Sequence, residues 1–558
     1  MSQVSQQMDL PLKLLGIMVL AAGAAAPLRA HPLQAEPINH PYVFTFDQFH
    51  LDVDGDESLV QGGLLLMAET RCLACHTAPK EWSERLEPPP APDLSAVGSR
   101  LDADTIWLMV RSPQHRKKGT LMPGIFSGAD DDAEKVEALT QYLVSLKRPT
   151  KPMPAGDAKK GRDLYHKVGC VACHEPAADK RPPGVPPDRE VEKPGNASVP
   201  IAFADAYEFH ALARFIFDPL STHPAGRMPS MRLAEQEASD IAAYLHVGRT
   251  AEKAIEREVL NIAPQTSQRG RELFVMQRCS VCHATGESLE KRSAHPLAEL
   301  NSHSGCLADT PDQGAPRFDF NPLQRRALRL ALDHVQQHRP EPMTAMQQTD
   351  WLMRRLNCYA CHDRDGKGGT EDPRAQYFIS SIRGADLLGD LGRLPPSLDH
   401  AGWKLTESWM DRVLHGPMIS VRPSLTVRMP NFGKPNTSLL AKSLREADLP
   451  AAPQLKAPPS GKPDQGRHLF GADALGCIRC HGLKAQKPLE ADGSNLTHTV
   501  ERLTPSYFRA VLLKPSDMQA GSLMPALFEG RTTAEDDIAS LWNFLADLDH
   551  HSSPFPSK

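Results

Sequence analysis

The stretch Gly161-Arg-Asp-Leu-Tyr-His-Lys-Val-Gly-Cys-Val-Ala-Cys-His174 decides how this chain folds, because both of its recognisable parts recur along the sequence. The first part is a Gly-x-x-Leu step, which returns at Gly63, Gly270 and Gly466 and indicates a helix that ends near the cysteines. The second part is Cys-x-x-Cys-His. Its five copies are Cys72-Leu-Ala-Cys75-His76, Cys170-Val-Ala-Cys173-His174, Cys279-Ser-Val-Cys282-His283, Cys358-Tyr-Ala-Cys361-His362 and Cys477-Ile-Arg-Cys480-His481. A segment repeated in this way predicts an array of similar structural units.

This pentapeptide is the attachment motif of c-type haem. Its two thiols bond to the haem vinyl groups, and its histidine ligates the iron from one face. The chain is therefore expected to carry five covalent haem groups, which use ten of its eleven cysteines and leave Cys306 over. A zinc site needs four converging ligands and gives no reason for a histidine directly after the second cysteine. A thioredoxin-like redox pair needs a βαβ context, and the sequence offers none.

Length and composition describe a globular, exported protein of several domains. The 558 residues exceed what one core holds, and a net charge of −5 favours neither nucleic acid nor an anionic membrane as a partner. Lys13 precedes an apolar run over 14–26, and Ala30 offers a cleavage point, so residues 1–30 are predicted to be a signal peptide. The expected location is the periplasm, with no membrane span in the mature chain.

A methionine loop follows the attachment motif in several units. Met122, Met228 and Met524 each precede a proline and each follow another proline by nine residues. Met429 lies in Arg428-Met-Pro-Asn-Phe-Gly433 after a longer loop, and this phrase resembles the ligand loop of class I cytochromes c. A methionine thioether opposite the histidine gives six-coordinate iron of raised potential, which suits electron transfer. These four methionines are the predicted sixth ligands.

A third helix closes each unit. Val136, Leu139, Leu143 and Leu146 form one apolar helical face, and similar faces recur near 238–245 and 538–545. Asn321-Pro322 predicts the start of another such helix. The order of helix, attachment motif, proline-rich loop, helix, methionine loop and helix is all-α and resembles the class I cytochrome c fold. The implied cytochrome c-like domains are 31–150, 151–255, 256–345, 346–450 and 451–558, joined by proline-rich linkers at 147–154, 250–265 and 449–463.

The third unit departs from this pattern. No methionine lies between His283 and the next apolar helix, and Ala315, in Gly-Ala-Pro, stands where Met-Pro is expected. The second helix of the other units is also missing from this one. The distal face of this haem is left with several alternatives, including an empty position or a buried, inert Cys306. The candidate ligands are His295, His303, Cys306, Met343 and Met346.

Two Asp-rich stretches, 52–56 and 363–369, resemble parts of a calcium loop. Neither completes the twelve-residue loop with its terminal glutamate, so turns are the preferred interpretation.

Several phrases resemble the multi-haem c-type cytochromes of planctomycetes and related bacteria. They are Gly63-Leu-Leu-Leu-Met-Ala-Glu-Thr-Arg-Cys-Leu-Ala-Cys-His76, Arg355-Leu-Asn-Cys-Tyr-Ala-Cys-His362 with Gly368-Gly369, Gly389-Asp-Leu-Gly-Arg-Leu-Pro-Pro396 and Gly402-Trp-Lys-Leu405. The resemblance implies a periplasmic haem protein with redox partner proteins and supplies no substrate.

The predicted function is electron transfer through four His/Met haems and one haem of atypical distal ligation. The alternative is a haem enzyme, peroxidase-like or another small-ligand reductase, with the His283 haem as its active site. A redox sensor or scaffold with mainly structural haems is the third hypothesis. The protein's own contribution in each case is to ligate, bury and orient the cofactor.

Overall fold

The chain folds into helices joined by long loops, as the repeat predicts. The only strands among the described residues are β1 (Asp363–Arg364) and β2 (Lys367–Gly368), which form a short antiparallel hairpin. The all-α class is therefore confirmed. The structure is a computed structural model, and it describes residues 38–49, 55–126, 130–177, 198–199, 201, 204, 206–246, 262–311, 314–380, 389–417, 425–449, 461–490, 493–519 and 521–548.

Some sequence predictions fall outside these residues. The signal peptide at 1–30 lies wholly outside them, as does most of the linkers at 250–265 and 449–463. Across the part of the chain that is described, no helix has the length and apolar character needed to cross a membrane.

Five units each combine a helix that leads into an attachment motif with a second long helix packed against it. We name each unit after the histidine of its motif. In four of these units, all but that of His362, a glycine marks the helix crossing: a Cβ at Gly161 would lie 1.8 Å from the Asp240 carbonyl oxygen, and one at Gly466 would lie 2.0 Å from that of Ser540. Only a glycine permits this approach, which explains why Gly-x-x-Leu recurs.

Three units are built from consecutive segments of the chain. Their paired helices lie in the predicted ranges 151–255, 346–450 and 451–558, except that α13 begins one residue earlier, at Ala345. The His174 unit contains α8 (Ala158–Lys167), α9 (Phe209–Phe217) and α10 (Glu235–His246). The His362 unit contains α13 (Ala345–Arg355), α14 (Asp372–Ala375), α15 (Asp390–Arg393), α16 (Ala401–Lys404), α17 (Glu407–His415), α18 (Lys434–Thr437) and α19 (Leu440–Asp448). The His481 unit contains α20 (Pro463–Phe470), α21 (Thr499–Arg502), α22 (Pro505–Leu513), α23 (Pro515–Met518) and α24 (Ala534–Ala546).

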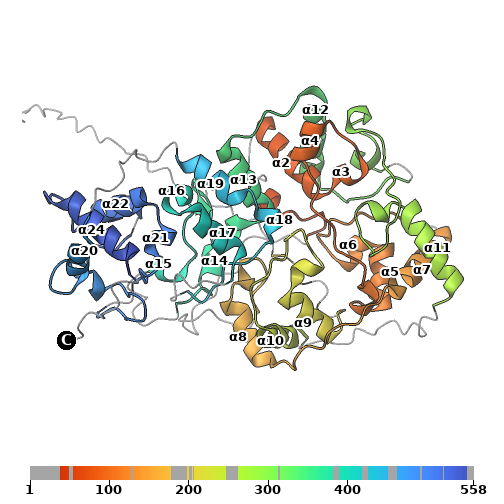
Figure 1. Ribbon diagram of the computed structural model, residues 1–558. Coiled ribbons are helices and arrows are strands. Elements are labelled where there is room, and N and C mark those ends of the chain that lie inside the picture. The colour runs from red at the N-terminus through yellow and green to blue at the C-terminus, as the bar shows by residue number, and fades with distance from the viewer. Residues whose placement is uncertain are drawn as a thin grey trace, which may run out of the picture.

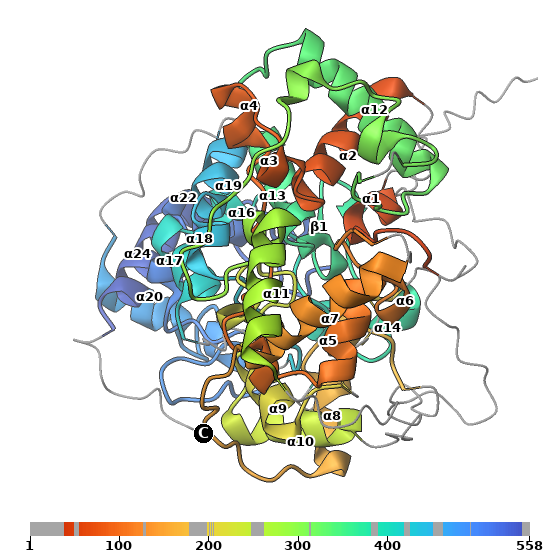
Figure 2. The ribbon, with the colours of Figure 1, turned by 90° about the vertical axis from the view of Figure 1, so that its right-hand side faces the viewer.

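The other two units exchange their second halves. The His76 unit contains α1 (Phe44–Phe49), α2 (Asp56–Glu69), α3 (Cys72–Cys75), α4 (Lys80–Arg85) and α12 (Pro322–Gln337). The His283 unit contains α5 (Ala103–Arg111), α6 (Pro113–Arg116), α7 (Asp130–Ser145) and α11 (Pro264–Met276). Helix α2 packs against α12, and α7 packs against α11, although the whole His174 unit lies between α7 and α11 in the sequence. Figure 2 shows both pairings.

The crossing glycines agree with this exchange. A Cβ at Gly63 on α2 would lie 2.0 Å from the Ala327 carbonyl oxygen on α12, and one at Gly270 on α11 would lie 1.9 Å from that of Ala138 on α7. The prediction of 31–150 and 256–345 as contiguous domains is therefore wrong. The physical reason is that the chain passes from one unit to the other shortly after each attachment motif.

The predicted closing helices are confirmed as α7, α10 and α24. Helix α12 begins as expected, because Asn321 caps it in a capping box with Gln324 and Pro322 occupies the first turn.

Four units form a ring, and the His481 unit extends from it (Figure 1). Backbone bridges join the His76 unit to the His283 unit (Gly124 with Arg317), the His283 unit to the His174 unit (Leu101 with Tyr207) and the His174 unit to the His362 unit (Ser230 with Asn431). The ion pair of Arg355 with Glu69 closes the ring. The bridge of Leu405 with Leu503 attaches the His481 unit to the His362 unit.

Candidate haem-binding sites

The five attachment motifs share one backbone conformation. The residue before the first cysteine lies in the left-handed region in every copy, and a helical turn follows in which the histidine N–H bonds to the carbonyl oxygen of the first cysteine at 2.9 to 3.0 Å. This turn brings two thiols and one imidazole to the same side of the chain. The left-handed residues are Arg71, Gly169, Arg278, Asn357 and Gly476.

Each motif histidine also has a backbone carbonyl beside its Nδ1 atom. Because a carbonyl only accepts, Nδ1 must carry the proton, which leaves the lone pair on Nε2, the nitrogen suited to bind iron. The pairs are His76 with His295 O at 2.7 Å, His174 with Val199 O at 2.8 Å, His283 with Pro92 O at 2.9 Å, His362 with Pro396 O at 2.7 Å and His481 with Ser494 O at 2.9 Å. The same Nδ1–carbonyl contact thus orients all five imidazoles.

The carbonyl partners locate the exchange between two of the units. His174, His362 and His481 bond to carbonyls 25, 34 and 13 residues later, in the loop that follows each motif. His76 bonds to a carbonyl 219 residues away, and His283 to one 191 residues away. Each of these two histidines therefore uses the loop that follows the other's motif.

Burial shifts the pKa values of the motif side chains. It raises the pKa of Cys72, Cys170, Cys279 and Cys358 to about 12, the opposite of the low thiol pKa of a reactive redox pair. Burial also lowers the pKa of His174, His283 and His481, so their imidazoles stay neutral. A neutral imidazole is the form that binds iron.

The methionine loops pair through backbone bridges, and each bridge lies at the same distance in sequence from the predicted ligand positions. Ser230 and Asn431 pair through two N–H···O bonds of 2.9 and 2.8 Å, and each lies two residues after a predicted ligand, Met228 or Met429. Gly124 and Arg317 pair in the same way, both bonds being 2.8 Å. Gly124 lies two residues after Met122, and Arg317 lies two residues after Ala315. The backbone thus places Ala315 at a methionine position, as the sequence predicted.

The structure changes the unit to which this alanine belongs. Phe318 and Phe320, just after Ala315, pack in the core that holds α2, α12 and Cys72. Phe126, just after Met122, packs with α7, α11 and Cys279. The unit that has Ala315 in place of methionine is therefore that of His76, and the prediction that it is the His283 unit is wrong. The predicted absence of a second helix is likewise a property of the His76 unit, where η5 (Leu297–Glu299) and η6 (Gly305–Leu307) occupy that part of the chain.

Two other predicted ligands pack in the core of their own unit. Met429 packs against the core that contains Cys358, and Met524 packs against the core that includes Cys477. Met228 takes the corresponding place in its loop, two residues before the Ser230–Asn431 bridge.

The remaining candidates for the atypical haem differ in their surroundings. The backbone of His295 lies on the imidazole side of His76, and its own side chain is 83% exposed. His303 is exposed, and Met346 is 57% exposed on α13 of another unit. Met343 packs on the His76 core, and Cys306 in η6 is close enough to Cys72 to affect its pKa. All three candidates with large exposure are poorly placed to ligate a buried iron.

A cavity of about 270 Å³ lies beside the Gly124–Arg317 bridge. Arg111, Gln114, Arg317 and Asp319 contribute its polar lining. Guanidinium groups are the preferred partners of carboxylates, and each haem carries two carboxylate groups. The residues at this place therefore suit the polar edge of a haem.

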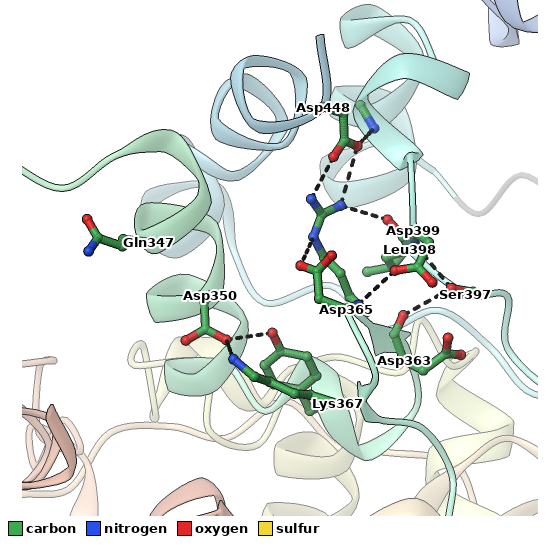
Figure 3. Close-up of polar contacts among 12 residues, drawn as sticks. Gln347, Asp350, Asp363, Asp365, Lys367, Ser397, Leu398, Asp399 and Asp448 are labelled. Carbon is green, nitrogen blue, oxygen red and sulfur yellow. Dashed lines mark hydrogen bonds and ion pairs between the residues drawn. The ribbon is translucent and has the colours of Figure 1, made fainter. Parts of the chain in front are cut away.

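The Asp-rich stretch at 363–369 is a turn, as predicted. Asp365 and Gly366 have φ of 51° and 72° at the tip of the β1–β2 hairpin. Asp448 on α19 accepts from the guanidinium of Arg364 at 2.6 Å, and Asp350 accepts from Tyr359 Oη at 2.7 Å. Figure 3 shows where Asp448 and Asp350 lie. These carboxylates hold the segment after Cys361 to its unit and are committed to protein donors. The companion stretch at 52–56 lies mostly outside the described residues.

A buried carboxylate joins three units, and nothing in the neighbouring residues predicts it. Glu69 on α2 is 4% exposed and accepts from Arg227 Nε at 3.0 Å and from Arg355 Nε at 3.2 Å. Burial alone would raise the pKa of Glu69, but the two guanidinium groups outweigh it and hold the pKa below its ordinary value. Arg227 precedes Met228, and Arg355 leads into the His362 motif, so one side chain ties together three of the units.

Comparison with known proteins agrees with this geometry. Residues 158–247 match the cytochrome c family, and this range spans the His174 unit from α8 to the end of α10. These residues form a haem-binding cytochrome c domain. No curated protein and no solved structure matches the chain. Among the described residues, no group of three or more His, Cys, Asp and Glu side chains is placed to hold a metal ion directly.

Proposed function

We propose that the chain is a pentahaem c-type cytochrome that transfers electrons between redox partner proteins. The observation that carries this proposal is the shared geometry of the five motifs, in which one turn and one Nδ1–carbonyl contact recur in all five. The domain at 158–247 is one instance, and the other four reproduce its local structure. Bound haem supplies a one-electron couple between ferric and ferrous iron. The resemblance to planctomycete multi-haem cytochromes and the predicted export to the periplasm fit the same proposal.

We assign the distal ligands from the packing of the loops. Met228, Met429 and Met524 would ligate in the His174, His362 and His481 units, which contain them. Met122 would ligate in the His283 unit, because its loop leads into α7, which packs on α11. The His76 unit would hold the haem of atypical ligation. Thioether ligation in four units fits haems of raised potential that exchange electrons.

The contacts between units support transfer through the whole chain. The attachment motifs approach one another in two pairs: Asn357 Nδ2 contacts Cys173 Sγ at 3.6 Å, and Cys75 affects the pKa of Cys282. The His481 unit is joined to the ring by Trp403, whose Nε1 donates to Ser506 Oγ at 2.9 Å. We therefore expect electrons to spread within the ring and to enter or leave through the His481 unit.

The loop that holds Met524 is the proposed contact for a partner protein. Leu523 is 64% exposed and Leu527 is 36% exposed, on either side of the Met524-Pro525 pair. An exposed apolar rim around a redox site suits a transient electron-transfer contact. We expect Leu523→Asp to slow electron exchange with a small soluble cytochrome about tenfold, whereas Leu439→Asp, at a position 55% exposed in the His362 unit, leaves the rate unchanged.

Haem stoichiometry tests the proposed function. Mass spectrometry of the protein matured in a host that attaches c-type haem is expected to show five covalent haems, all of which are reversibly reduced in a spectroscopic redox titration. Fewer than five haems, or haems that do not exchange electrons with small cytochromes, would contradict the proposal. The second outcome would favour the sensor or scaffold hypothesis.

A further inference from the structure

We propose that the His76 unit binds a small exogenous iron ligand, such as carbon monoxide or cyanide, at the position where Ala315 replaces methionine. The inference rests on the proposed function, because it requires a haem on Cys72, Cys75 and His76. It differs from the sequence-based alternative, which placed an open haem on His283.

The register of the distal loops is the first step. Four loops form two antiparallel bridges, and each bridging residue lies two positions after Met122, Ala315, Met228 or Met429. In the bridge of the His174 and His362 units, both loops present a methionine. In the bridge of the His76 and His283 units, one loop presents Met122 and the other presents a methyl group. A methyl group has no lone pair and cannot ligate iron.

The side chains around Ala315 are the second step. Phe318 and Phe320 stack with ring centroids 5.1 Å apart and join the core of the His76 unit. They bring the Ala315 loop onto α12, which packs on the helix before the attachment motif. The loop thus keeps the distal placement that it has in the other units. Alanine has no Cγ, Sδ or Cε, so the space that these atoms of a methionine fill is left free. A diatomic molecule fills a similar space.

The rival protein ligands are the third step. His295 lies on the opposite, imidazole side, and His303 and Met346 are exposed. The loop that carries Cys306 is fixed to α12 by Arg325, which donates to Ala308 O at 2.5 Å, and by Arg329, which donates to Leu307 O at 2.9 Å. Cys306 is therefore part of an anchored turn that precedes the distal loop, and Met343 follows α12. Neither takes the register position that Met122, Met228 and Met429 share.

Ligand binding to the purified five-haem protein tests the proposal. The reduced protein is titrated with carbon monoxide and the oxidised protein with cyanide, and low-temperature spin resonance counts the high-spin haems. We expect one of the five haems to be high-spin and to bind each probe. Ala315→Met is expected to abolish both properties, whereas Met122→Ala is expected to double the number of binding haems, because it opens the His283 unit as well.

Two controls keep the outcome specific. Cys306→Ser and Met343→Leu should leave one binding haem, since neither residue occupies the distal position. Five low-spin haems in the parent protein with no carbon monoxide binding would overturn the inference, as would binding that survives Ala315→Met or that first arises in Cys306→Ser. These results leave haem number and reversible reduction untouched, so they are distinguishable from a failure of the proposed function.

Discussion

The pair of units at His76 and His283 and the pair at His174 and His362 are built from the same parts in different chain order. In both pairs the attachment motifs approach each other and the distal loops bridge two residues after the ligand position. In the His174 and His362 pair, each histidine bonds to the loop that follows its own motif. In the other pair, each histidine bonds to the loop that follows its partner's motif.

The difference teaches that a repeat identifies the parts without fixing which parts join. An exchange between two similar units preserves every local contact, so its cost in free energy is small. The connections then decide the outcome. The consequence here is chemical, because the exchange delivers Met122 to the His283 unit and leaves Ala315 to the His76 unit.

The largest effect is expected at the junction of the two pairs. Glu69→Gln removes the buried charge between Arg227 and Arg355 and is expected to destabilise the protein by about 3 kcal/mol, measured from the shift of the urea midpoint. Asp56→Asn is the control, because Asp56, also on α2, is 69% exposed in its ion pair with Arg326. That change should cost less than about 0.5 kcal/mol.

The effect of Glu69 should also depend on pH. Its folded-state pKa lies below the ordinary value, so its contribution is present above the unfolded-state pKa and is lost as the pH falls through the folded-state pKa. The difference between the parent protein and Glu69→Gln should therefore be full at neutral pH and shrink below about pH 4. A difference that grows on acidification would mean that Glu69 is not held ionised by the two arginines.

The next effect concerns the helix crossings of the exchanged pair. Gly63→Ala and Gly270→Ala each force a Cβ against a carbonyl oxygen of the partner helix, and each is expected to cost about 2 kcal/mol. Amide hydrogen exchange measured by mass spectrometry separates them. Gly63→Ala should speed exchange in α12, and Gly270→Ala should speed exchange in α7. The contiguous arrangement predicts the reverse, since α2 would then pack on α7.

The smallest effect concerns the residue before the methionine in each of the two loop bridges, which is charged in one bridge and apolar in the other. Arg428, before Met429, donates to both Glu237 oxygens at 2.8 and 2.6 Å, whereas Leu121, before Met122, packs into the apolar core of the His76 unit. Arg428→Gln should cost about 1 kcal/mol, and the loss should shrink in high salt. The cost of Leu121→Ala should not shrink with salt. Equal salt dependence in thermal unfolding would show that the bridges do not differ in this way.

The sequence predicts the parts of this fold well and their assembly only in part. The motifs, the closing helices and the capped start of α12 follow from local spacing, and the structure contains them. The alignment of Ala315 with the methionine positions also holds, because the bridge register depends on neighbouring residues.

The exchange could not be predicted from the sequence. Gly63 and Gly270 begin similar Gly-x-x-Leu segments, and α7 and α12 present similar apolar faces, so either helix could pack on either segment. The carbonyls of His295 and Pro92 and the carboxylate of Glu69 act through long-range contacts. Nothing in their local sequence marks them.

The most direct test of the exchange is to remove one haem at a time from the two exchanged units. Cys72→Ser with Cys75→Ser is compared with Cys279→Ser with Cys282→Ser, and the methionine–iron charge-transfer absorption of the oxidised proteins is measured. We expect the first variant to keep this absorption in full, and the second to lose about a quarter of it, because Met122 serves the His283 unit. Loss of absorption in the first variant and retention in the second would contradict the exchange.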